Sequence, residues 1–411
     1  MIEPTPPVAL DLSRLLARAG RETATGIDRV ELAYAEHRLK AGPVSCFSAS
    51  TPLGSIGLLP REGAEALISA TAASWRGGPA PPDRARTMQR LSRKLRASLI
   101  LQGEATLAAR LRNRGGTPVY LLVSHHHLEQ RRAIARLKER AAARFVCLIH
   151  DLIPVLYPEY AKPGQSDQHR RRIETAAQLA DAIIVNSAVT RDTLLPHLDR
   201  ARRHPPVLVA PFGTDLQALP NEPPATLKRP YFVYVSTIEA RKNHLLLLNL
   251  WRAMAEELGE AAPLLVLIGQ RGWEAENVVD MLERCPALRG VVIEHNELSD
   301  AAMVRLLRGA RAMLLPSFAE GFGFPLIEGF TLGLPALCSD IPALRETGAG
   351  IPEFFDPLDG LGWRAAILDY AAEQSPRRAA QLERLSRWRP ARWEDHFAAV
   401  DGLIRETAAH A

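Results

Sequence analysis

Two glutamates and two glycines lie close together in one stretch of the chain. Glu320 and Glu328 are separated by seven residues, and Gly321 and Gly323 follow the first glutamate. Backbone N–H groups at a helix start, beside glycines that allow a close approach, form an anion site suited to phosphate. Because two carboxylates would repel a bare phosphate, we expect them to accept hydrogen bonds from hydroxyl groups beside it, as on a ribose or a hexose. The alternative is an ordinary helix with acidic residues near its dipole.

The residues around this pair predict a strand, a loop, a helix and a second strand. An apolar run of strand length covers 312–315, Pro325 suits the first turn of the helix, and Gly333 ends it. The second strand is predicted over 335–339. In a parallel sheet, this order places the helix N-terminus at the carboxyl edge. Because a helical side chain leans toward the N-terminus of its helix, Glu328 is expected to point back toward the loop.

Two cations precede a leucine-rich helix in the second half of the chain. Arg241 and Lys242 follow a strand predicted over 231–235. An arginine can bind two oxygens and a lysine supplies a point charge, so the pair beside a helix N-terminus suits a diphosphate. The alternative is surface charge at the start of a helix.

Polar residues also follow two predicted strands in the first half of the chain. His150 and Asp151 come after the strand over 145–149, at the end where open α/β sheets place ligand contacts. The alternative for His150 is a core histidine with satisfied hydrogen bonds. The strand over 119–123 leads to three consecutive histidines, of which His126 is the middle one. Adjacent side chains on an extended chain point alternately, so we expect hydrogen bonding in a cleft rather than a metal site.

A glycine and a basic segment are further candidates. Gly26 lies where a polar loop meets a helix predicted over 27–39, which is another place for the polar groups of a ligand. The alternative is an ordinary capped helix. The segment 84–114 is rich in arginine, with leucines at helical spacing. It predicts either a solvated surface helix or peripheral contact with an anionic membrane.

Composition and pattern indicate a two-domain α/β protein. The chain has 411 residues, a net charge of +5 and four cysteines far apart in the sequence, which indicates neither a zinc site nor a disulfide framework. The positive charge suits phosphate-rich ligands or an anionic membrane surface. No signal peptide and no apolar run of about 20 residues is evident, so we expect a cytoplasmic protein. Further strands, alternating with helices, are expected over 8–12, 182–185, 207–209, 264–268 and 291–296.

The stretch with the paired glutamates resembles family 4 of the retaining glycosyltransferases. The matching residues are SFAEGFGFPLIEGFTLGLP, and TGIDRVELAYAEHRL, HDLIPVLYPEY and PFGTD resemble other segments of that family. The resemblance implies the GT-B fold, in which two Rossmann-like domains face each other across a deep cleft. The expected organisation is an acceptor-binding domain over 1–218, a proline-rich linker over 219–230, a nucleotide-sugar-binding domain over 231–390 and a C-terminal helix over 391–411 that returns to the first domain.

The resemblance also implies roles for single residues. Lys242 matches the phosphate-binding lysine of the family, whereas Thr237 stands where the common pattern has an arginine, which Arg241 is expected to replace. Glu328 would bind the ribose and Glu320 the donor hexose.

Further residues are assigned by the same resemblance. His150 would contact the transferred sugar near its reacting end. The remaining expected donor contacts are Phe322 and Phe324 with the two glycines, and His295, Asn296 and Leu298 near the base. Gly26, Asp151 and His126 are expected on the acceptor side.

The implied reaction is transfer of a hexose from a nucleotide-diphosphate sugar to a glycan or lipid-linked acceptor, with retention of anomeric configuration. The departing phosphate would assist front-face attack. No Asp-x-Asp triplet occurs, so we do not expect a metal. We also expect neither a cofactor nor a nucleic-acid partner. The resemblance leans toward GDP-mannose-like donors in bacterial surface-polysaccharide synthesis. The open alternatives are a hydrolase that uses the two glutamates, a nucleotide-sugar epimerase of the same fold and a non-catalytic sugar-nucleotide-binding or scaffold protein.

Overall fold

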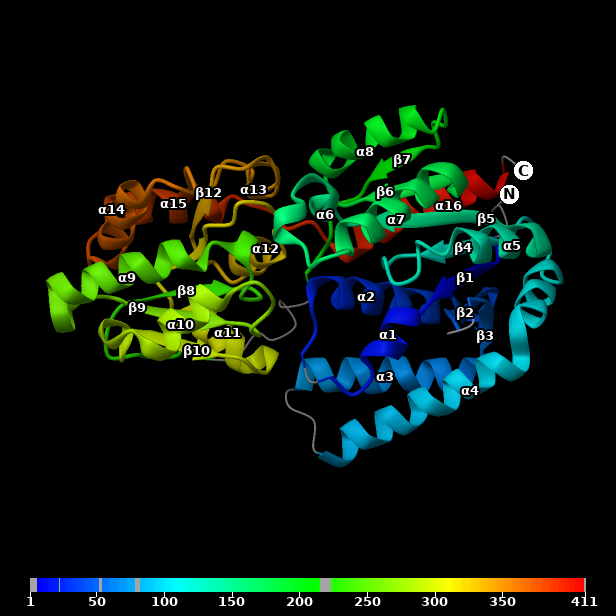
Figure 1. Ribbon diagram of the computed structural model, residues 1–411, viewed down its shortest axis with the longest axis horizontal. Helices are drawn as coiled ribbons and strands as arrows, with labels where there is room; N and C mark the ends of the chain where they lie inside the picture. The colour runs from blue at the N-terminus through cyan, green and yellow to red at the C-terminus, as the bar shows by residue number, and fades with distance from the viewer. Residues whose placement is uncertain (1–5, 22, 52–53, 78–81, 215–222, 410–411) are drawn as a thin grey trace. The chain divides into compact units, whose positions relative to one another are not determined.

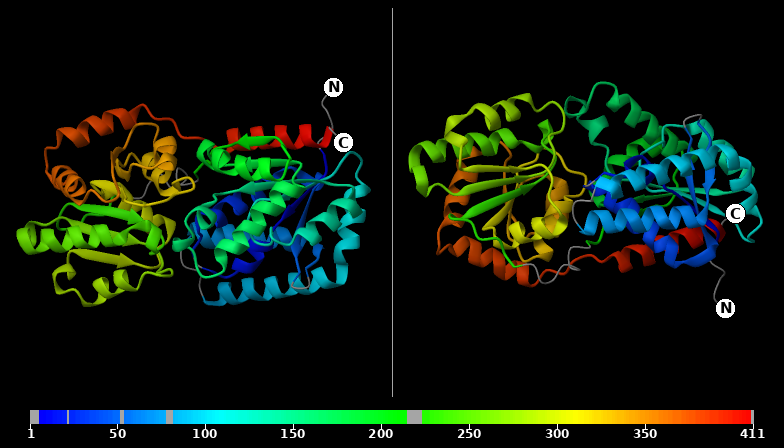
Figure 2. Two further views of the ribbon diagram at one scale, coloured as in Figure 1. Left: turned by 45° about the horizontal axis from the view of Figure 1, so that its top comes forward. Right: turned by 90° about the horizontal axis from the view of Figure 1, so that it is seen from below.

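The chain folds into two compact α/β units. The structure, a computed structural model, describes residues 6–21, 23–51, 54–77, 82–214 and 223–409 (Figure 1). In each unit helices cover both faces of one sheet (Figure 2). Unit 1 comprises Met1–Val155, Gly164–Gly213 and Ala391–Ala411, and unit 2 comprises Leu156–Pro163 and Thr214–Pro390.

Unit 1 contains a seven-stranded sheet with the order β3-β2-β1-β4-β5-β6-β7. Neighbouring strands are parallel except for β2 and β3, which form an antiparallel pair. The order reverses at β1 and β4, as in a Rossmann fold. The strands are β1 (Val8–Asp11), β2 (Ser45–Ser50), β3 (Ile56–Leu59), β4 (Val119–Leu122), β5 (Arg144–Ile149), β6 (Ala182–Val185) and β7 (Val207–Val209).

Nine α-helices belong wholly or mainly to the described part of unit 1, and one of them comes from the end of the chain. They are α1 (Ser13–Arg18), α2 (Gly26–Lys40), α3 (Arg61–Gly77), α4 (Pro82–Arg112), α5 (Arg131–Ala141), α6 (Ile153–Leu156), α7 (Gln165–Leu179), α8 (Ala188–Arg200) and α16 (Trp393–Ala409). Helix α16 packs against α2, because the Tyr34 hydroxyl bonds to Nε2 of His396 over 2.8 Å and the Tyr34 ring meets Phe397 edge-on.

Unit 2 contains a six-stranded sheet with the order β10-β9-β8-β11-β12-β13, and all its neighbouring strands are parallel. This is again the Rossmann order, with the reversal at β8 and β11. The strands are β8 (Tyr231–Val235), β9 (Leu264–Ile268), β10 (Val292–His295), β11 (Ala312–Leu315), β12 (Ala336–Ser339) and β13 (Glu353–Phe355), and the helices are α9 (His244–Leu258), α10 (Glu276–Arg284), α11 (Asp300–Gly309), α12 (Phe324–Thr331), α13 (Pro342–Gly348), α14 (Gly360–Ala371) and α15 (Pro376–Ser386).

Strand β8 supplies apolar side chains to two separate cores. Phe232 and Tyr234 join the core beneath α9 and α14, whereas Tyr231 and Val233 join the core beneath α11 and α12. Successive side chains of a strand point to opposite faces, so a sheet with helices on both faces needs a continuous apolar run. The predicted strands over 182–185, 207–209, 231–235, 264–268 and 312–315 coincide with the observed ones for this reason.

The grouping of the described residues into units departs from the sequence order in two places. Leu156–Pro163 is grouped with unit 2, because the Tyr160 ring stacks on Phe318 at 5.9 Å and the Tyr160 carbonyl accepts a hydrogen bond from Nε1 of Trp273. The expected boundary at residue 218 lies outside the described residues. Residues 391–411 are grouped with unit 1.

Part of the expected linker over 219–230 lies outside the described residues, namely 219–222. Farther along the linker, the Ala225 N–H donates to the Arg305 carbonyl of α11 over 2.8 Å. In the part of the chain that the structure describes, no helix is both long and apolar enough to cross a membrane.

A buried carboxyl group lies where α1 and α2 meet in unit 1. Glu31 has no exposed surface, and its Oε1 accepts a hydrogen bond from the Leu15 N–H over 2.9 Å. Burial, with Asp11 adding to it, raises the pKa of Glu31 to about 8 despite that hydrogen bond. The folded protein therefore holds a proton on Glu31 that an unfolded chain releases near the ordinary pKa of glutamate.

This linkage predicts how stability changes with pH. The pKa of Glu31 is higher in the folded state, so its contribution is present at low pH and is lost as pH rises from about 4.5 to about 8. Glu31→Gln removes the ionisation. As the pH rises from 5 to 9, we expect the free energy of unfolding of the variant to increase by about 2–4 kcal/mol relative to that of the wild type. Urea denaturation at several pH values measures this difference. Parallel pH profiles for the two proteins would contradict this.

Candidate active site

The candidate donor site lies at the carboxyl ends of β8 and β11 in unit 2. These adjacent parallel strands flank the point where the strand order reverses, which is where open α/β sheets bind ligands. The loop after β8 carries Arg241 and Lys242 in a short 3-10 turn, Ala240–Lys242. The loop after β11 carries Glu320. The fold therefore brings together residues that are nearly eighty positions apart in the sequence.

Three side chains converge on the carboxylate of Glu320. Lys242 Nζ donates to Oε1 over 2.6 Å, Arg241 Nη1 donates to Oε2 over 3.2 Å, and the Ser317 hydroxyl donates to Oε1 over 2.7 Å. The Glu320 and Lys242 side chains are 8% and 10% exposed. The two cations therefore meet at a single position that is suited to an anionic group.

Arg241 also ties the two loops together. Its Nε pairs with Oε1 of Glu239 over 2.6 Å, and its Nη1 donates to the Ala319 carbonyl over 2.8 Å. Its own carbonyl accepts a hydrogen bond from the Phe318 N–H over 2.8 Å. A guanidinium can bind several oxygens in fixed directions, which a lysine cannot. Arg241 thus fixes the loop that carries Glu320 and contacts that carboxylate as well.

The charges of this cluster shift its pKa values. Burial alone would raise the pKa of Glu320, but the charges of Lys242 and Arg241 and the hydrogen bonds from Lys242 and Ser317 outweigh it and lower the pKa to about 2. Burial, and next the nearby charge of Arg241, lower the pKa of Lys242. Glu320 is therefore ionised at neutral pH.

The predicted loop and helix are present beside this cluster. Gly323 immediately precedes α12 with a positive φ of 88°, and a Cβ at this position would lie 2.8 Å from Leu344 Cδ2. The backbone conformation favours a glycine here, and a larger residue would also have to displace the end of the Leu344 side chain. Pro325 lies in the first turn as predicted, and Glu328 is buried in the same helix at 6% exposure. Phe322 and Phe324 flank Gly323 with their rings edge-to-face, and Gly321 is half-buried.

The residues expected near the base lie farther along the same carboxyl edge. His295 ends β10, and its carbonyl accepts a hydrogen bond from the Gly269 N–H over 2.9 Å. Asn296 and Leu298 follow in the loop before α11. Strand β9 lies between β10 and β8, so these residues are two strands away from Lys242.

In unit 1, His150 lies at the end of β5 in a network of buried polar groups. Its ring Nε2 faces the Val123 carbonyl over 2.8 Å and therefore carries the proton, and Asn186 Nδ2 donates to the His150 carbonyl. Burial lowers the pKa of His150 to about 4, so the ring is neutral at pH 7. Its Nδ1 is then a hydrogen-bond acceptor. Asp151 Oδ1 accepts a hydrogen bond from the Ile153 N–H at the start of α6.

The three consecutive histidines enter three different environments. The His125 ring lies 5.2 Å from His150 and 4.9 Å from His169, and burial lowers its pKa well below the usual range. His126 is exposed. The buried His127 bonds through Nε2 to the Tyr120 hydroxyl over 2.8 Å. Only His126, the predicted acceptor-side residue, leaves its ring accessible.

An ion pair that sequence reasoning missed lies beside Gly26. Gly26 is the exposed first residue of α2, and Thr25 with Asp28 forms a capping box before it. Arg14 Nε pairs with Oδ1 of the fully buried Asp28 over 2.6 Å, and Arg14 Nη2 donates to the Thr25 hydroxyl over 3.1 Å. The spacing of Thr25 and Asp28 could have indicated the capping box. No sequence pattern pointed to Arg14, because the fold alone brings it there.

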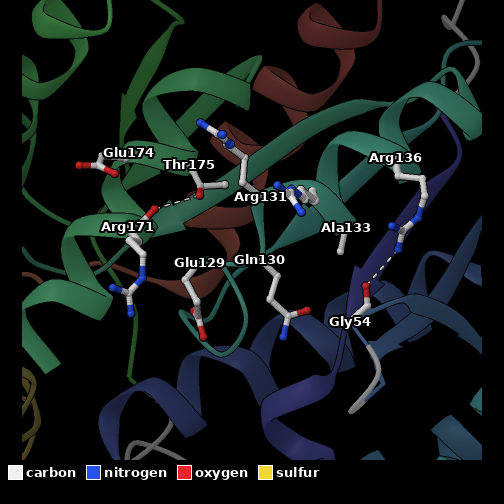
Figure 3. Close-up of a pocket in the computed structure, with 10 residues that line it drawn as sticks. Gly54, Glu129, Gln130, Arg131, Ala133, Arg136, Arg171, Glu174 and Thr175 are labelled. Carbon is white, nitrogen blue, oxygen red and sulfur yellow. Dashed lines mark hydrogen bonds between the residues drawn. The ribbon is translucent and has the colours of Figure 1, made fainter. Parts of the chain in front are cut away.

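A pocket of about 580 Å³ in unit 1 contains none of the predicted site residues. Four of its lining side chains are arginines, but Arg131 and Arg171 point in different directions, and Arg136 donates to the Gly54 carbonyl (Figure 3). Arg136 is also paired with Glu104. These cations do not converge on one point, in contrast to the two at Glu320.

The chain is similar to glycosyltransferases. Residues 217–349, which contain the Lys242–Glu320 cluster, match the model of the family described as glycosyl transferases group 1. The serotype-specific mannosyltransferase WbdA of Escherichia coli is 31% identical over 227 residues, which is 50% of this chain and 27% of that protein. O-antigen chain mannosyltransferase B of Escherichia coli is 26% identical over 263 residues, with coverage of 61% and 68%. The chain thus spans about a quarter of the length of the first of these relatives.

The fold of the chain is also similar to that of solved structures. Sucrose-phosphate synthase from Thermosynechococcus elongatus superposes with a TM-score of 0.65 at 15% identity, covering 99% of this chain and 100% of that one. The prediction of a GT-B fold with two Rossmann-like domains is confirmed. The resemblance to mannosyltransferases of surface-polysaccharide synthesis is confirmed as well.

The direct contact between Lys242 and Glu320 predicts that the losses of stability caused by replacing these two residues are not additive. Lys242→Met leaves the carboxylate of Glu320 without its nearest cation, and Glu320→Gln leaves Lys242 without this carboxylate. Removing one partner of a buried pair leaves the other charge uncompensated, so we expect each single variant to lose about 2–4 kcal/mol. The double variant should lose less than the sum by at least about 1 kcal/mol, measured by urea denaturation. Additive losses would mean that the two side chains do not interact.

Proposed function

We propose that the chain is a retaining glycosyltransferase that moves a hexose from a nucleotide-diphosphate sugar to a glycan or lipid-linked acceptor. The observation that carries the proposal is the convergence of Lys242 and Arg241 on one point at the switch of the unit 2 sheet. This point lies within the segment that matches the group 1 glycosyl transferases. Binding sites of open α/β sheets occur at such switch points, which supports the assignment.

The two cations are proposed to bind the diphosphate of the donor. In a transfer reaction this diphosphate is the leaving group, and negative charge grows on it as the bond to the sugar breaks. Fixed cations and the N–H groups at the start of α12 stabilise that charge without reorganising during the reaction. Arg241 takes the role for which the family pattern has an arginine at Thr237. No metal and no cofactor is part of the proposal.

Three polar side chains are proposed to bind the sugars. The ionised Glu320 would accept hydrogen bonds from hydroxyls of the donor hexose, and Glu328 from those of the ribose. His150 is neutral, with its proton on Nε2, so its Nδ1 would accept a hydrogen bond from a sugar hydroxyl near the reacting carbon. None of these groups acts as a nucleophile in the proposed mechanism, since the departing phosphate assists the front-face attack.

The names of the relatives support a mannose-type donor. WbdA and O-antigen chain mannosyltransferase B are both mannosyltransferases, and both matches exceed 220 residues. We therefore favour a GDP-mannose-like donor, with His295, Asn296 and Leu298 near the base. Gly26, Asp151 and His126 are proposed to contact the acceptor.

A calorimetric titration tests the donor site. A panel of nucleotide-sugars and free nucleotides is titrated without divalent metal. We expect one diphosphonucleoside to bind, and Lys242→Ala to weaken it at least about a hundredfold because a charge-assisted contact to phosphate is lost. Arg252→Ala, which removes an exposed cation of α9 in the same unit, is the matched control and should bind as the wild type does.

Other outcomes would favour the alternative functions. Isomerisation of the sugar without an acceptor would indicate an epimerase, and donor binding without any turnover would indicate a non-catalytic protein. If no nucleotide binds even with metal added, the cluster is not a donor site.

Peripheral membrane contact is proposed for α4, which contains most of the basic segment 84–114. Arg86, Arg90 and Lys94 are exposed and spaced four residues apart, Arg93 is exposed beside them, and Ile100 is 62% exposed farther along the helix. The opposite face is buried through Met88, Leu95 and Leu99. A basic face with an exposed apolar side chain suits the anionic inner face of a cell membrane. A cytoplasmic location at that membrane is part of the proposal.

Vesicle sedimentation tests this contact. We expect the chain to bind vesicles that contain phosphatidylserine more strongly than vesicles of phosphatidylcholine alone. The double variant Arg90→Glu, Lys94→Glu should lose at least about tenfold in affinity, since each basic residue near the surface contributes about 1 kcal/mol. The control is Arg252→Glu, Arg284→Glu, which reverses two exposed charges in unit 2. Equal losses in both double variants would show that net charge rather than α4 is responsible.

A further inference from the structure

Both candidate phosphate-binding cations already have a carboxylate partner within the protein. Lys242 Nζ lies 2.6 Å from Glu320 Oε1, and Glu320 is its one side-chain partner among the described residues. Arg241 pairs with Glu320 as well, and with Glu239. A diphosphate that binds Lys242 must therefore share this cation with Glu320 or displace the carboxylate from it.

Displacement of the Glu320 carboxylate from Lys242 has different consequences for a bound nucleotide-sugar and for a bound bare nucleoside diphosphate. Moving the carboxylate away from Lys242 leaves a charge that is 8% exposed and needs new hydrogen-bond donors. A nucleotide-sugar brings hexose hydroxyls, which can supply them. A bare nucleoside diphosphate brings no hydroxyl beyond its terminal phosphate, and it adds a negative charge there. At a separation of about 4 Å in a partly buried site, two like charges repel by several kcal/mol before relaxation.

We propose that Glu320 is an exchangeable counter-ion that makes the site prefer the nucleotide-sugar over the bare nucleoside diphosphate and so expels the product. This inference rests on the proposed function. When the donor binds, Lys242 turns to the diphosphate and Glu320 to the hexose. When the hexose has left, Glu320 has lost the sugar hydroxyls and keeps only that of Ser317, so it competes with the product for Lys242.

The neighbouring carboxylate of Glu239 provides a control that distinguishes the proposed role of Glu320 from a general effect of negative charge. Glu239 is 3% exposed and pairs with Nε of Arg241 over 2.6 Å. Its backbone carbonyl accepts a hydrogen bond from the Lys242 N–H over 3.0 Å, but among the described contacts its carboxylate does not pair with Lys242 Nζ, which is bound to Glu320. Glu239 therefore carries the same charge beside the same arginine without occupying the lysine. Substitution of either glutamate by glutamine removes one negative charge and keeps the size of the side chain. In Glu320→Gln the amide oxygen can still accept the hydrogen bond from Ser317.

The test compares the dissociation constants of GDP and GDP-mannose, or of the pair selected by the calorimetric panel, for the wild type and both variants. We expect Glu320→Gln to bind the bare diphosphate about tenfold or more tightly, the factor that corresponds to one charge-assisted hydrogen bond. Its affinity for the nucleotide-sugar should rise less or fall. Product inhibition should increase in parallel. Glu239→Gln should not change the ratio of the two constants, and thermal melting checks that both variants fold.

Two results would overturn the inference while leaving the proposed function intact. One is unchanged or weaker binding of the bare diphosphate to Glu320→Gln, with the nucleotide-sugar still bound by the wild type. The other is an equal change of the ratio in both variants, which would be a general effect of charge. If the wild type binds neither nucleotide, the proposed function itself fails.

Discussion

Lys242 and Arg241 hold the carboxylate of Glu320 at a position from which most water is excluded. Such a group is stable as an ion only if its partners compensate for the lost hydration. The lowered pKa of Glu320 reflects that compensation. The cluster in turn requires the Rossmann order of the sheet, because only the adjacency of β8 and β11 brings the two loops together. The chemistry proposed for unit 2 depends on this one interaction.

Unit 1 presents a different kind of polar site. His125 and His150 are buried, burial lowers the pKa of both rings, and they are fixed by the Val123 carbonyl and by each other. A neutral ring with a known proton position is a directional acceptor for hydroxyl groups, which suits a sugar better than a phosphate. The charged pair of Arg14 and Asp28 lies beside Gly26. The two candidate sites thus differ chemically. The site in unit 2 contains cations, and the buried His125 and His150 of unit 1 are neutral hydrogen-bond acceptors.

The sequence predicted the central strands of both sheets because these strands are buried on both faces. Their apolar runs are continuous, and β11 was predicted to the residue. It did not predict β2, β3 or α3, where the antiparallel edge of the unit 1 sheet gives a weaker pattern. The grouping of Leu156–Pro163 with unit 2 depends on contacts with Phe318 and Trp273 that no local pattern contains.

The candidate site was predictable where a residue lies in a motif and unpredictable where the fold alone creates the contact. Glu320 and Lys242 could be named from their loops, but not their direct ion pair. Glu239, Ser317 and Arg14 were missed for the same reason. The ion pair changes the proposed role of Glu320 from that of a sugar ligand alone to that of a group that also competes for the proposed phosphate-binding cations.

A crystal structure of the chain with its tightest-binding nucleotide-sugar would test the central claim most directly. We expect a phosphate oxygen within about 3 Å of Lys242 Nζ, and the Glu320 carboxylate turned toward hexose hydroxyls. A nucleotide bound elsewhere in unit 2, with Lys242 still paired to Glu320, would contradict the assignment of this cluster as the donor site.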